Sequence, residues 1–404
     1  MRADAVIIGA GASGMLCAIS LAKQGKRVVL IERLRRGGKK ILASGNGHCN
    51  ITNTKISAKN YLAKNKELLH SILQDCSSKK IVTLFRELGL EIEAKEDGRM
   101  FPASSQARSV LEILEATIAN LDISTFYEVE ELQVQKGFVV TLPDRKISTK
   151  NLIIATGSLA APALGGSDFG LQIAKSFGHS IIKPLPALTP LESKTPLCKV
   201  LNGVKLFVAI KAFIEQKEAT SVQGDILFRE YGISGLGVLD ISLYIARALD
   251  EQKEVFLEID FMPKMNKKEL IAFLQGRVNK QRALSILVWL GGFLHLKLAQ
   301  VLIKELHLEQ KSEKNLSKKD IIAIANFLKA KKIKIEALRG FKYAEVALGG
   351  VDSKEIHSKT LESKKQKGLF FIGEVLDITG QRGGYNFHFA WCSALRVARF
   401  VLTN

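Results

Sequence analysis

The first 32 residues constrain the fold most, because a glycine-rich turn stands between the elements that such a turn requires. An apolar stretch at residues 4–8 precedes Gly9-Ala10-Gly11-Ala12-Ser13-Gly14, and a small-residue helix is expected over residues 15–24. A second strand at residues 27–31 ends at Glu32. Glycine permits a sharp turn and a close pyrophosphate, and the helix N-terminus offers free N–H groups. The pattern predicts a dinucleotide site in which Glu32 accepts the ribose hydroxyls.

The same stretch has a second interpretation, since Met1-Arg2 followed by uncharged residues 5–22 is also typical of a targeting segment. The glycine spacing, the lack of a cleavage site and the immediate second strand argue against export. Five scattered cysteines without a C-x-x-C pair indicate a reducing compartment and argue against a zinc ribbon. We therefore expect a cytoplasmic protein with no metal site, and the sequence contains no further apolar run of membrane length.

The net charge is +19, from 59 Lys and Arg against 40 Asp and Glu. Such an excess attracts polyanions, so nucleic acid must be considered as a partner. The lysines are spread in short runs, however, without the interleaved aromatic residues that would make a stacking platform for bases. The pattern therefore favours solvated lysine faces and an anionic cofactor, with a specific role in binding RNA or DNA as the alternative.

A loop rich in Gly, Ser and Asn follows the acid at residues 37–50, and its backbone amides can line a cofactor. Its run GGKKILASGNGHCNITN resembles the signature loop of the YhiN/BaiN-like flavoproteins, which are FAD-dependent oxidoreductases with three domains. The resemblance implies that this loop lies along FAD. The family more often has Arg where this chain has His48.

Three later segments carry the resemblance further, in the family's order. Residues 152–157 (LIIATG) predict a parallel strand covered on both faces, ending in the Thr-Gly element of FAD enzymes. Residues 368–374 predict a strand that ends in an acid able to accept the ribityl hydroxyls. Residues 380–386 (GQRGGYN) predict a turn before a helix, whose N-terminus would stabilise negative charge on the reduced flavin.

The expected cofactor contacts come from these segments and from the end of a strand near residue 129, where a backbone contact to adenine is expected. They are Gly9, Gly11, Ala12, Ser13, Gly14, Glu32, Arg33, Gly38, Lys39, Ser44, Gly45, Asn46, Asn50, Val129, Ala155, Thr156, Gly157, Gly373, Glu374, Gly383, Gly384, Tyr385 and Asn386.

Three residues are candidates for catalysis. Arg99 lies in a GR-x-FP stretch of the family and could bind a substrate carboxylate, or be a surface arginine near a turn. Tyr231 could donate a proton, stack on a ring or pack; it follows Arg229-Glu230, where the family usually has Thr-His. His388 is expected near the flavin, together with Cys49 and Cys392.

The expected fold class is α/β, with a Rossmann-like FAD-binding domain, an inserted β-rich, barrel-like domain and a small helical cap. The FAD-binding domain is expected at residues 1–190 and 346–404, the β-rich domain at 191–262 and 322–345, and the cap at 263–321. A turn is expected at Lys136-Gly137.

The expected function is that of an FAD-dependent oxidoreductase, which moves hydride between flavin N5 and an unidentified small organic substrate. The sequence has no second complete G-x-G-x-x-G unit, so NAD(P)H either binds transiently as the donor or is not used at all. The alternative is a tRNA- or RNA-directed flavoprotein that uses its basic surface.

Overall fold

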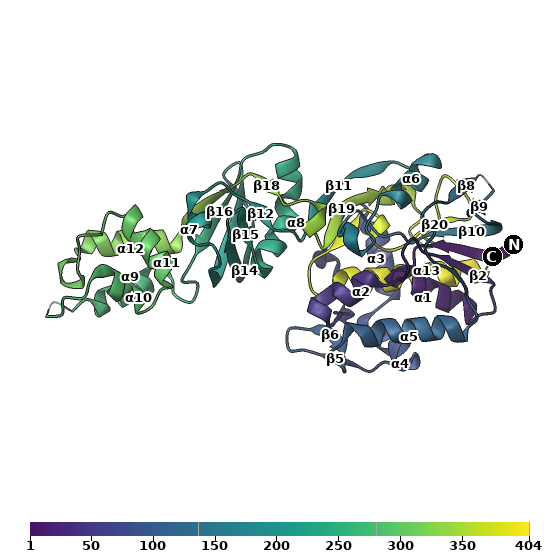
Figure 1. Cartoon of the computed structure of the whole chain (residues 1–404), viewed down its shortest axis with the longest axis horizontal. Helices are drawn as coiled ribbons and strands as arrows, with labels where there is room; N and C mark the ends of the chain where they lie inside the picture. The colour runs from purple at the N-terminus through teal and green to yellow at the C-terminus, as the bar shows by residue number, and fades with distance from the viewer. Residues whose placement is uncertain (136, 280, 404) are drawn as a thin grey trace. The chain divides into compact units, whose positions relative to one another are not determined.

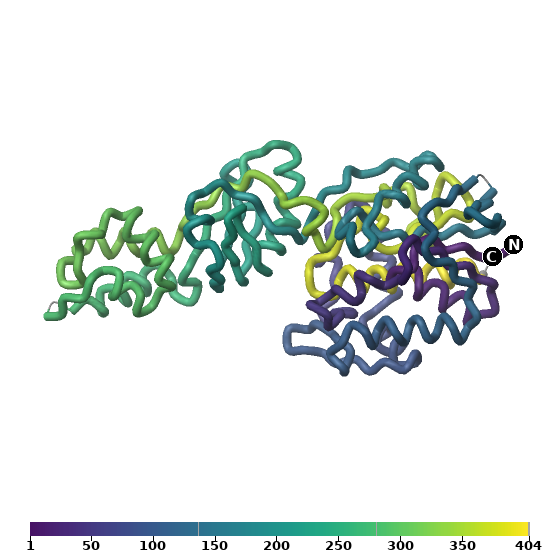
Figure 2. The backbone as a smooth tube through the Cα atoms, viewed as in Figure 1, coloured from purple at the N-terminus to yellow at the C-terminus, as the bar shows by residue number. Residues whose placement is uncertain are grey.

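The computed structural model describes residues 1–135, 137–279 and 281–403, and the chain divides into two units. The first comprises Met1–Leu185 and Glu345–Asn404, and the second comprises Pro186–Ala344. Both ends of the chain, purple and yellow in Figure 2, therefore belong to the first unit. The turn expected at Lys136-Gly137 includes residue 136, which lies outside the described residues.

A seven-stranded sheet forms the centre of the first unit (Figure 1). Four neighbouring strands run parallel in the order β7, β2, β1, β10, and the far edge of β10 pairs with parallel β20 and antiparallel β9, which is followed by β8. The return at β20 brings the last segment of the chain beside β10. The bounds are β1 (Arg2–Ile8), β2 (Val28–Ile31), β7 (Ser124–Phe126), β8 (Gln133–Gln135), β9 (Val139–Thr141), β10 (Lys146–Ile154) and β20 (Leu369–Phe371).

The helices of the first unit include one from each end of the chain, because α1 packs against both α13 and α5. Polar caps begin two others: the Asn65 side chain accepts the Leu68 N–H before α3, and Ser77 accepts the Lys80 N–H before α4. The bounds are α1 (Ala12–Ala22), α2 (Lys39–Ala43), α3 (Lys66–Asp75), α4 (Ser78–Glu87), α5 (Ala107–Asn120), α6 (Phe169–Ser176) and α13 (Tyr385–Thr403).

Short strands lie outside the main sheet and connect the segments that carry the candidate site. β21 pairs with β4, β19 with β11, and β6 pairs with both β3 and β5. Their bounds are β3 (Thr52–Asn53), β4 (Tyr61–Ala63), β5 (Ile92–Ala94), β6 (Arg99–Pro102), β11 (Ile181–Ala187), β19 (Val346–Val351) and β21 (Ile378–Gly380).

The second unit contains a curled sheet of seven strands in the order β17, β16, β13, β14, β15, β12, β18. The two edge strands, β17 and β18, are separated in the sequence by Glu336 alone. One short segment therefore supplies both edges of the sheet and brings them toward each other, as in a barrel. Along β16, buried positions alternate with half-buried ones, which is typical of a strand with one covered face. The bounds are β12 (Leu191–Glu192), β13 (Lys205–Ile214), β14 (Lys217–Arg229), β15 (Gly232–Ser234), β16 (Val255–Asp260), β17 (Lys331–Ile335) and β18 (Ala337–Leu338).

The helices of the second unit share its hydrophobic core with the sheet, since buried Leu274 and Trp289 belong to the same cluster as Val255 and Ile333. The cap boundary expected at residues 321 and 322 is wrong, because a capping box at Ser317 starts a helix that continues to Lys329. The bounds are α7 (Pro196–Val200), α8 (Leu236–Asp250), α9 (Lys267–Arg277), α10 (Ile286–Gly291), α11 (Leu296–Glu305) and α12 (Lys318–Lys329).

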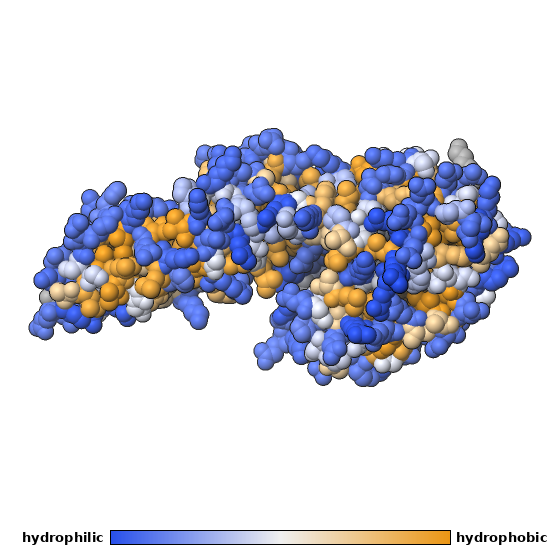
Figure 3. Space-filling model, in the orientation of Figure 1, coloured by the Kyte–Doolittle hydropathy of each residue, from blue (hydrophilic) through white to orange (hydrophobic). Residues whose placement is uncertain are grey.

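Hydrophobic side chains reach the surface of this helical part, as the orange residues on its visible face in Figure 3 show. Val288 and Leu296 each have an exposed fraction of 57%, and Ile322 of 45%. Among the described residues, however, no helix combines the length and the apolar character needed to cross a bilayer.

Candidate functional site

The turn after β1 has the geometry required to hold a pyrophosphate. A Cβ on Gly9 would lie 2.5 Å from Ala155 O, and a Cβ on Gly14 would lie 1.9 Å from Gly9 O, so both positions require glycine for packing. Gly11 differs from them, because no atom of the described residues comes within 4 Å of a Cβ placed there. The space in front of Gly11 is therefore open for a ligand.

The N-terminus of α1 faces the same turn. Met15 N–H donates to Gly11 O at 3.0 Å. The N–H groups of Ala12, Ser13 and Gly14 lie in this first turn of the helix, and such groups commonly bind phosphate oxygens. Pyrophosphate contacts at these three residues stay a prediction.

Glu32 is held beside the turn by two backbone groups. Its carboxylate accepts the Ala10 N–H at 2.8 Å and the Leu34 N–H at 2.9 Å, while the side chain of Arg33 is exposed. The Val129 N–H donates to Glu32 O at 3.1 Å, so an adenine contact at Val129 would have to use its carbonyl oxygen.

The signature loop, residues 37–50, contacts the turn after β1 where the loop begins, and its residues 45–48 are exposed. Gly38, with φ of +69°, donates its N–H to Ala10 O at 2.9 Å. Lys39 begins α2, and the Ser44 hydroxyl donates to Ile41 O at 2.7 Å. Gly45 and Asn46 follow in left-handed conformations and are both exposed, while Asn50 is buried.

Glu374 joins three distant segments of the chain. Its carboxylate pairs with Lys40 Nζ at 3.0 Å and accepts the Ser158 hydroxyl at 2.8 Å and the Ala347 N–H at 3.0 Å. A Cβ on the preceding Gly373 would lie 2.7 Å from Ser13 Oγ, so this turn also lies against the start of α1. The sequence indicated Glu374, but it carried no local signal for Lys40, Ser158 or Ala347.

Replacing Glu374 with Ala should destabilise the protein, because it leaves one ammonium and two hydrogen-bond donors without their acceptor. We expect a loss of about 2 kcal/mol in the free energy of unfolding, measured by chemical denaturation. Glu374→Gln retains an acceptor oxygen and should lose less. Equal losses for the two variants would contradict this account.

The turn before α13 lies against the signature loop. A Cβ on Gly384 would lie 2.5 Å from Thr52 O and 2.7 Å from Asn50 Oδ1, and Asn53 Nδ2 donates to Gly383 O at 2.9 Å. The Asn386 side chain bonds both the N–H and the carbonyl of Gly380, at 2.7 and 2.8 Å. These contacts position the N-terminus of α13, where Tyr385 begins the helix.

The end of β10 lies beside the end of β1 and is followed by a buried threonine hydroxyl. Ala155 N–H donates to Ile8 O at 2.8 Å, which places the end of β10 beside the end of β1. Thr156 Oγ1 is buried without a hydrogen-bond partner in the described part of the chain, and Gly157 turns with φ of +71°. A Cβ on Gly170 would lie 2.0 Å from Thr156 Oγ1, so this hydroxyl faces the start of α6, and it is the open space at Gly11 that fits a bound dinucleotide.

The structure assigns Arg99 and Tyr231 partners other than a substrate. Arg99 pairs with Asp97 at 2.7 Å in the turn between β5 and β6, with its side chain 42% exposed. Tyr231 lies in the second unit between β14 and β15, and the guanidinium carbon of Arg339 lies 3.3 Å from the centre of its ring. A catalytic role for either residue stays a prediction.

His388 is fully buried within α13. Thr52 Oγ1 lies 2.8 Å from its Nδ1, and Cys76 O lies 3.0 Å from its Nε2. Burial lowers the pKa of His388 to about 4, so the ring is neutral at pH 7. Through these contacts His388 connects α13 to the loop at Thr52. Its expected catalytic role stays a prediction.

The buried neutral His388 should make stability depend on pH. Its pKa in the folded protein, about 4, lies below the ordinary value of 6.5, so the unfolded chain binds the proton more tightly. The contribution of neutral His388 to the free energy of unfolding is therefore fully present above pH 6.5. It is lost as the pH falls toward 4, and the loss is roughly 3 kcal/mol. Denaturant titrations across this window should show the loss. His388→Gln should flatten it, and an equal slope in that variant would contradict the assignment.

The scattered cysteines indicated a reducing compartment, but two of them are paired in the structure. Cys76 and Cys392, which are 316 residues apart, form a disulfide between the end of α3 and α13. Spacing along the sequence cannot show such a pair, because only the folded chain brings the two residues together. His388 Nε2 lies 3.4 Å from Cys392 Sγ, so these residues form a buried cluster.

The remaining cysteines, Cys17, Cys49 and Cys198, are free and buried. Burial raises the pKa of Cys49 to about 12 and that of Cys198 to about 11, so both thiols stay protonated. Neither has the low pKa that a reactive cysteine requires.

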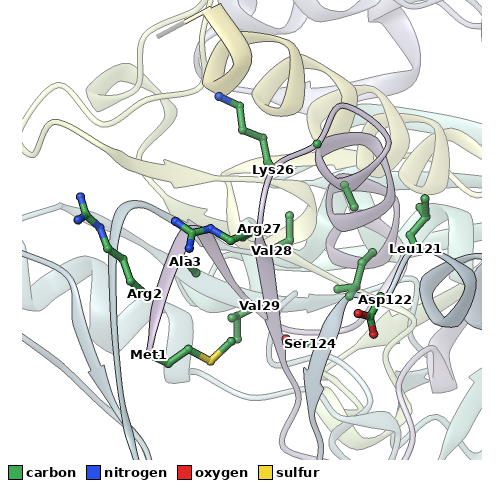
Figure 4. Close-up of a pocket in the computed structure, with 13 residues that line it drawn as sticks. Met1, Arg2, Ala3, Lys26, Arg27, Val28, Val29, Leu121, Asp122 and Ser124 are labelled. Carbon is green, nitrogen blue, oxygen red and sulfur yellow. The ribbon is translucent and has the colours of Figure 1, made fainter.

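A pocket of about 380 Å³ lies at the amino ends of β1, β2 and β7 (Figure 4). Its lining includes Met1, Arg27 and Asp122. Ligands of parallel α/β sheets bind at the carboxyl ends of the strands, where the glycine turn lies. This pocket is therefore at the edge opposite the candidate site.

The fold and the site together define an FAD-dependent oxidoreductase with a Rossmann-type cofactor domain. Its family is shown by the match of residues 3–400 to the HI0933-like protein Rossmann domain, and the chain belongs to this family. The expected resemblance, fold class and enzyme class are thereby confirmed.

Three characterised relatives align over nearly their whole length. Two are named ribosomal RNA dihydrouridine synthase: the one from Haemophilus influenzae is 36% identical over 97% of both chains, and the one from Escherichia coli K12 is 34% identical over 99% of this chain and 98% of its own. A 3-dehydro-bile acid delta(4,6)-reductase from Clostridium scindens is 33% identical over 97% of both.

The fold is also similar to a solved structure. The 3-ketosteroid delta1-dehydrogenase from Sterolibacterium denitrificans superposes with a TM-score of 0.52 over 100% of this chain and 99% of that one. At 11% identity, this likeness concerns the fold alone.

Proposed function

We propose that this enzyme reduces a uridine of ribosomal RNA to dihydrouridine. The substrate is the C5=C6 bond of uracil, which is conjugated to the C4 carbonyl. The product gains one hydride and one proton.

Reduction of a carbon–carbon double bond is the chemistry that the relatives' names share. A dihydrouridine synthase saturates the C5=C6 bond of uridine, and a delta(4,6)-reductase saturates ring double bonds of a 3-dehydro-bile acid. Both substrates carry a carbonyl able to accept electron density while hydride adds to the double bond. This common chemistry supports an ene-reductase whatever the substrate.

The net charge of +19 is the observation that carries the choice of RNA. A chain with 59 basic and 40 acidic residues attracts a polyanion, whereas a bile acid carries a single carboxylate. The two relatives named for ribosomal RNA point to the same substrate. A small organic substrate, the expectation from sequence, remains the second candidate because of the Clostridium scindens relative.

The chain's own groups would hold the cofactor along one face of the first unit. The N–H groups at the start of α1 would bind the pyrophosphate, Glu32 the adenosine ribose, and Glu374 with Lys40 the ribityl chain. The N-terminus of α13, placed by Gly383 and Gly384, would face the pyrimidine end of the flavin. When bound, FAD supplies hydride from N5. NAD(P)H as electron donor and a cytoplasmic location are parts of this proposal.

The test uses ribosomal RNA transcribed in vitro, which carries no modified nucleosides. We would incubate it with the FAD-loaded enzyme and NADPH or NADH, digest it and measure dihydrouridine by mass spectrometry. We expect dihydrouridine with at least one donor and none with the Gly11→Glu variant. Reduction of a 3-oxo-4-ene steroid without any dihydrouridine would overturn the RNA proposal in favour of the second candidate.

A further inference from the structure

Three residues of the second unit form a cation–π stack that none of the cofactor contacts uses. The guanidinium carbon of Arg339 lies 3.3 Å from the centre of the Tyr231 ring and 4.3 Å from that of Tyr343. Tyr343 is 44% exposed, and Lys342 Nζ lies 5.7 Å from the centre of its ring. The sequence showed no aromatic platform, because Tyr231 is more than a hundred residues from the other members.

The backbone holds the members of the stack through one short strand. Arg339 N–H donates to Pro190 O at 3.0 Å, and Ser193 N–H donates to Tyr231 O at 3.0 Å, so both residues are anchored at the ends of β12. Gly340 then turns the chain with φ of +82°, which brings Tyr343 back over Arg339. Backbone hydrogen bonds of the sheet therefore fix the positions of Arg339 and Tyr231.

The guanidinium of Arg339 has no carboxylate or carbonyl acceptor among the described residues, although it is partly buried between two rings. An arginine that serves packing alone normally directs its donors to acceptors of the protein. Here the rings of Tyr231 and Tyr343 orient the guanidinium of Arg339. Its N–H donors remain available for a ligand. Lys342, which is exposed beside Tyr343, adds a second positive charge.

We propose that Tyr231, Arg339 and Tyr343 bind an unpaired base of the RNA substrate and its phosphate. Aromatic rings and arginine planes are the groups on which proteins stack single-stranded bases, and arginine also pairs with phosphate oxygens. Tyr343 supplies the exposed ring, Arg339 the donors, and Tyr231 the inner support. This inference rests on the proposed function, because it assumes that RNA is the substrate.

The experiment measures binding of a fluorescein-labelled twelve-nucleotide oligouridine to the FAD-loaded enzyme by anisotropy, at several salt concentrations. Tyr343→Ala should weaken binding about tenfold, while Tyr343→Phe, which keeps the ring, should change it less than about twofold. Arg339→Met should lower the slope of log affinity against log salt by about one, since it removes one phosphate contact. Leu236→Ala, a substitution at an exposed position of the same unit, is the matched control.

A second probe keeps the inference testable if a variant does not fold. The wild-type enzyme should bind an abasic strand of the same length about tenfold more weakly than oligouridine, and Tyr343→Ala should not distinguish the two probes. Equal affinity of the wild type for both probes would overturn the stack as a base site.

Dihydrouridine formation on ribosomal RNA, measured in parallel, separates the two proposals. Activity in the wild type together with unchanged binding by Tyr343→Ala would refute the stack alone. Absence of both RNA binding and dihydrouridine would refute the proposed function, and the stack with it.

Discussion

Gly11→Glu should weaken cofactor binding strongly while leaving the protein folded. The backbone at Gly11 has φ of −82° and ψ of −168°, which any residue adopts, and a Cβ there meets no described atom within 4 Å. The new carboxylate would enter the space in front of α1 and repel the pyrophosphate. We expect FAD affinity to fall by about 100-fold or more, equivalent to about 2.7 kcal/mol, measured by titration of the apoprotein with FAD.

The matched control is Gly276→Glu, because Gly276 also faces open space but lies in α9 of the second unit. It should bind FAD as the wild type does. Both apoproteins should unfold at the wild-type temperature. A Gly11→Glu protein that still binds FAD tightly would show that the cofactor lies elsewhere.

Removing the disulfide should cause the largest loss of stability. Cys76→Ala combined with Cys392→Ala frees two segments that are 316 residues apart and so restores much conformational freedom to the unfolded chain. We expect a loss of about 2 to 5 kcal/mol in the free energy of unfolding. A reductant should lower the stability of the wild type and leave that of the double variant unchanged.

Cys198→Ala is the control for the loss of a buried thiol, since Cys198 is free. Alkylation of the denatured, unreduced protein provides a direct check. Mass spectrometry should find three modified cysteines, and modification of all five would contradict the disulfide.

Local patterns allowed much of the first unit to be predicted. The strand, glycine turn and helix at the start of the chain are consecutive in sequence, so spacing and hydrophobicity alone indicate them. The strand at residues 152–154 and the helix from Tyr385 were equally clear, because an apolar run and a glycine turn mark them.

Contacts between distant segments could not be predicted in this way. The contacts of Glu374 with Lys40 and Ser158, the disulfide of Cys76 and the contact of Arg339 with Tyr231 join residues more than a hundred positions apart, and one sequence carries no pairing information over that distance. The helical cap was predicted to end at residue 321 and the β-rich domain to resume at residue 322, but the helix that follows the capping box at Ser317 continues to Lys329. That signal was present in the sequence as Ser and Asp three residues apart.

The central claim is that the two ends of this chain bind one FAD molecule. The most direct measurement is the visible absorbance of the purified protein, followed by identification of the cofactor released on denaturation. The account predicts an oxidised-flavin spectrum and one FAD per chain, either as purified or after adding FAD. A colourless protein that takes up no FAD would contradict it.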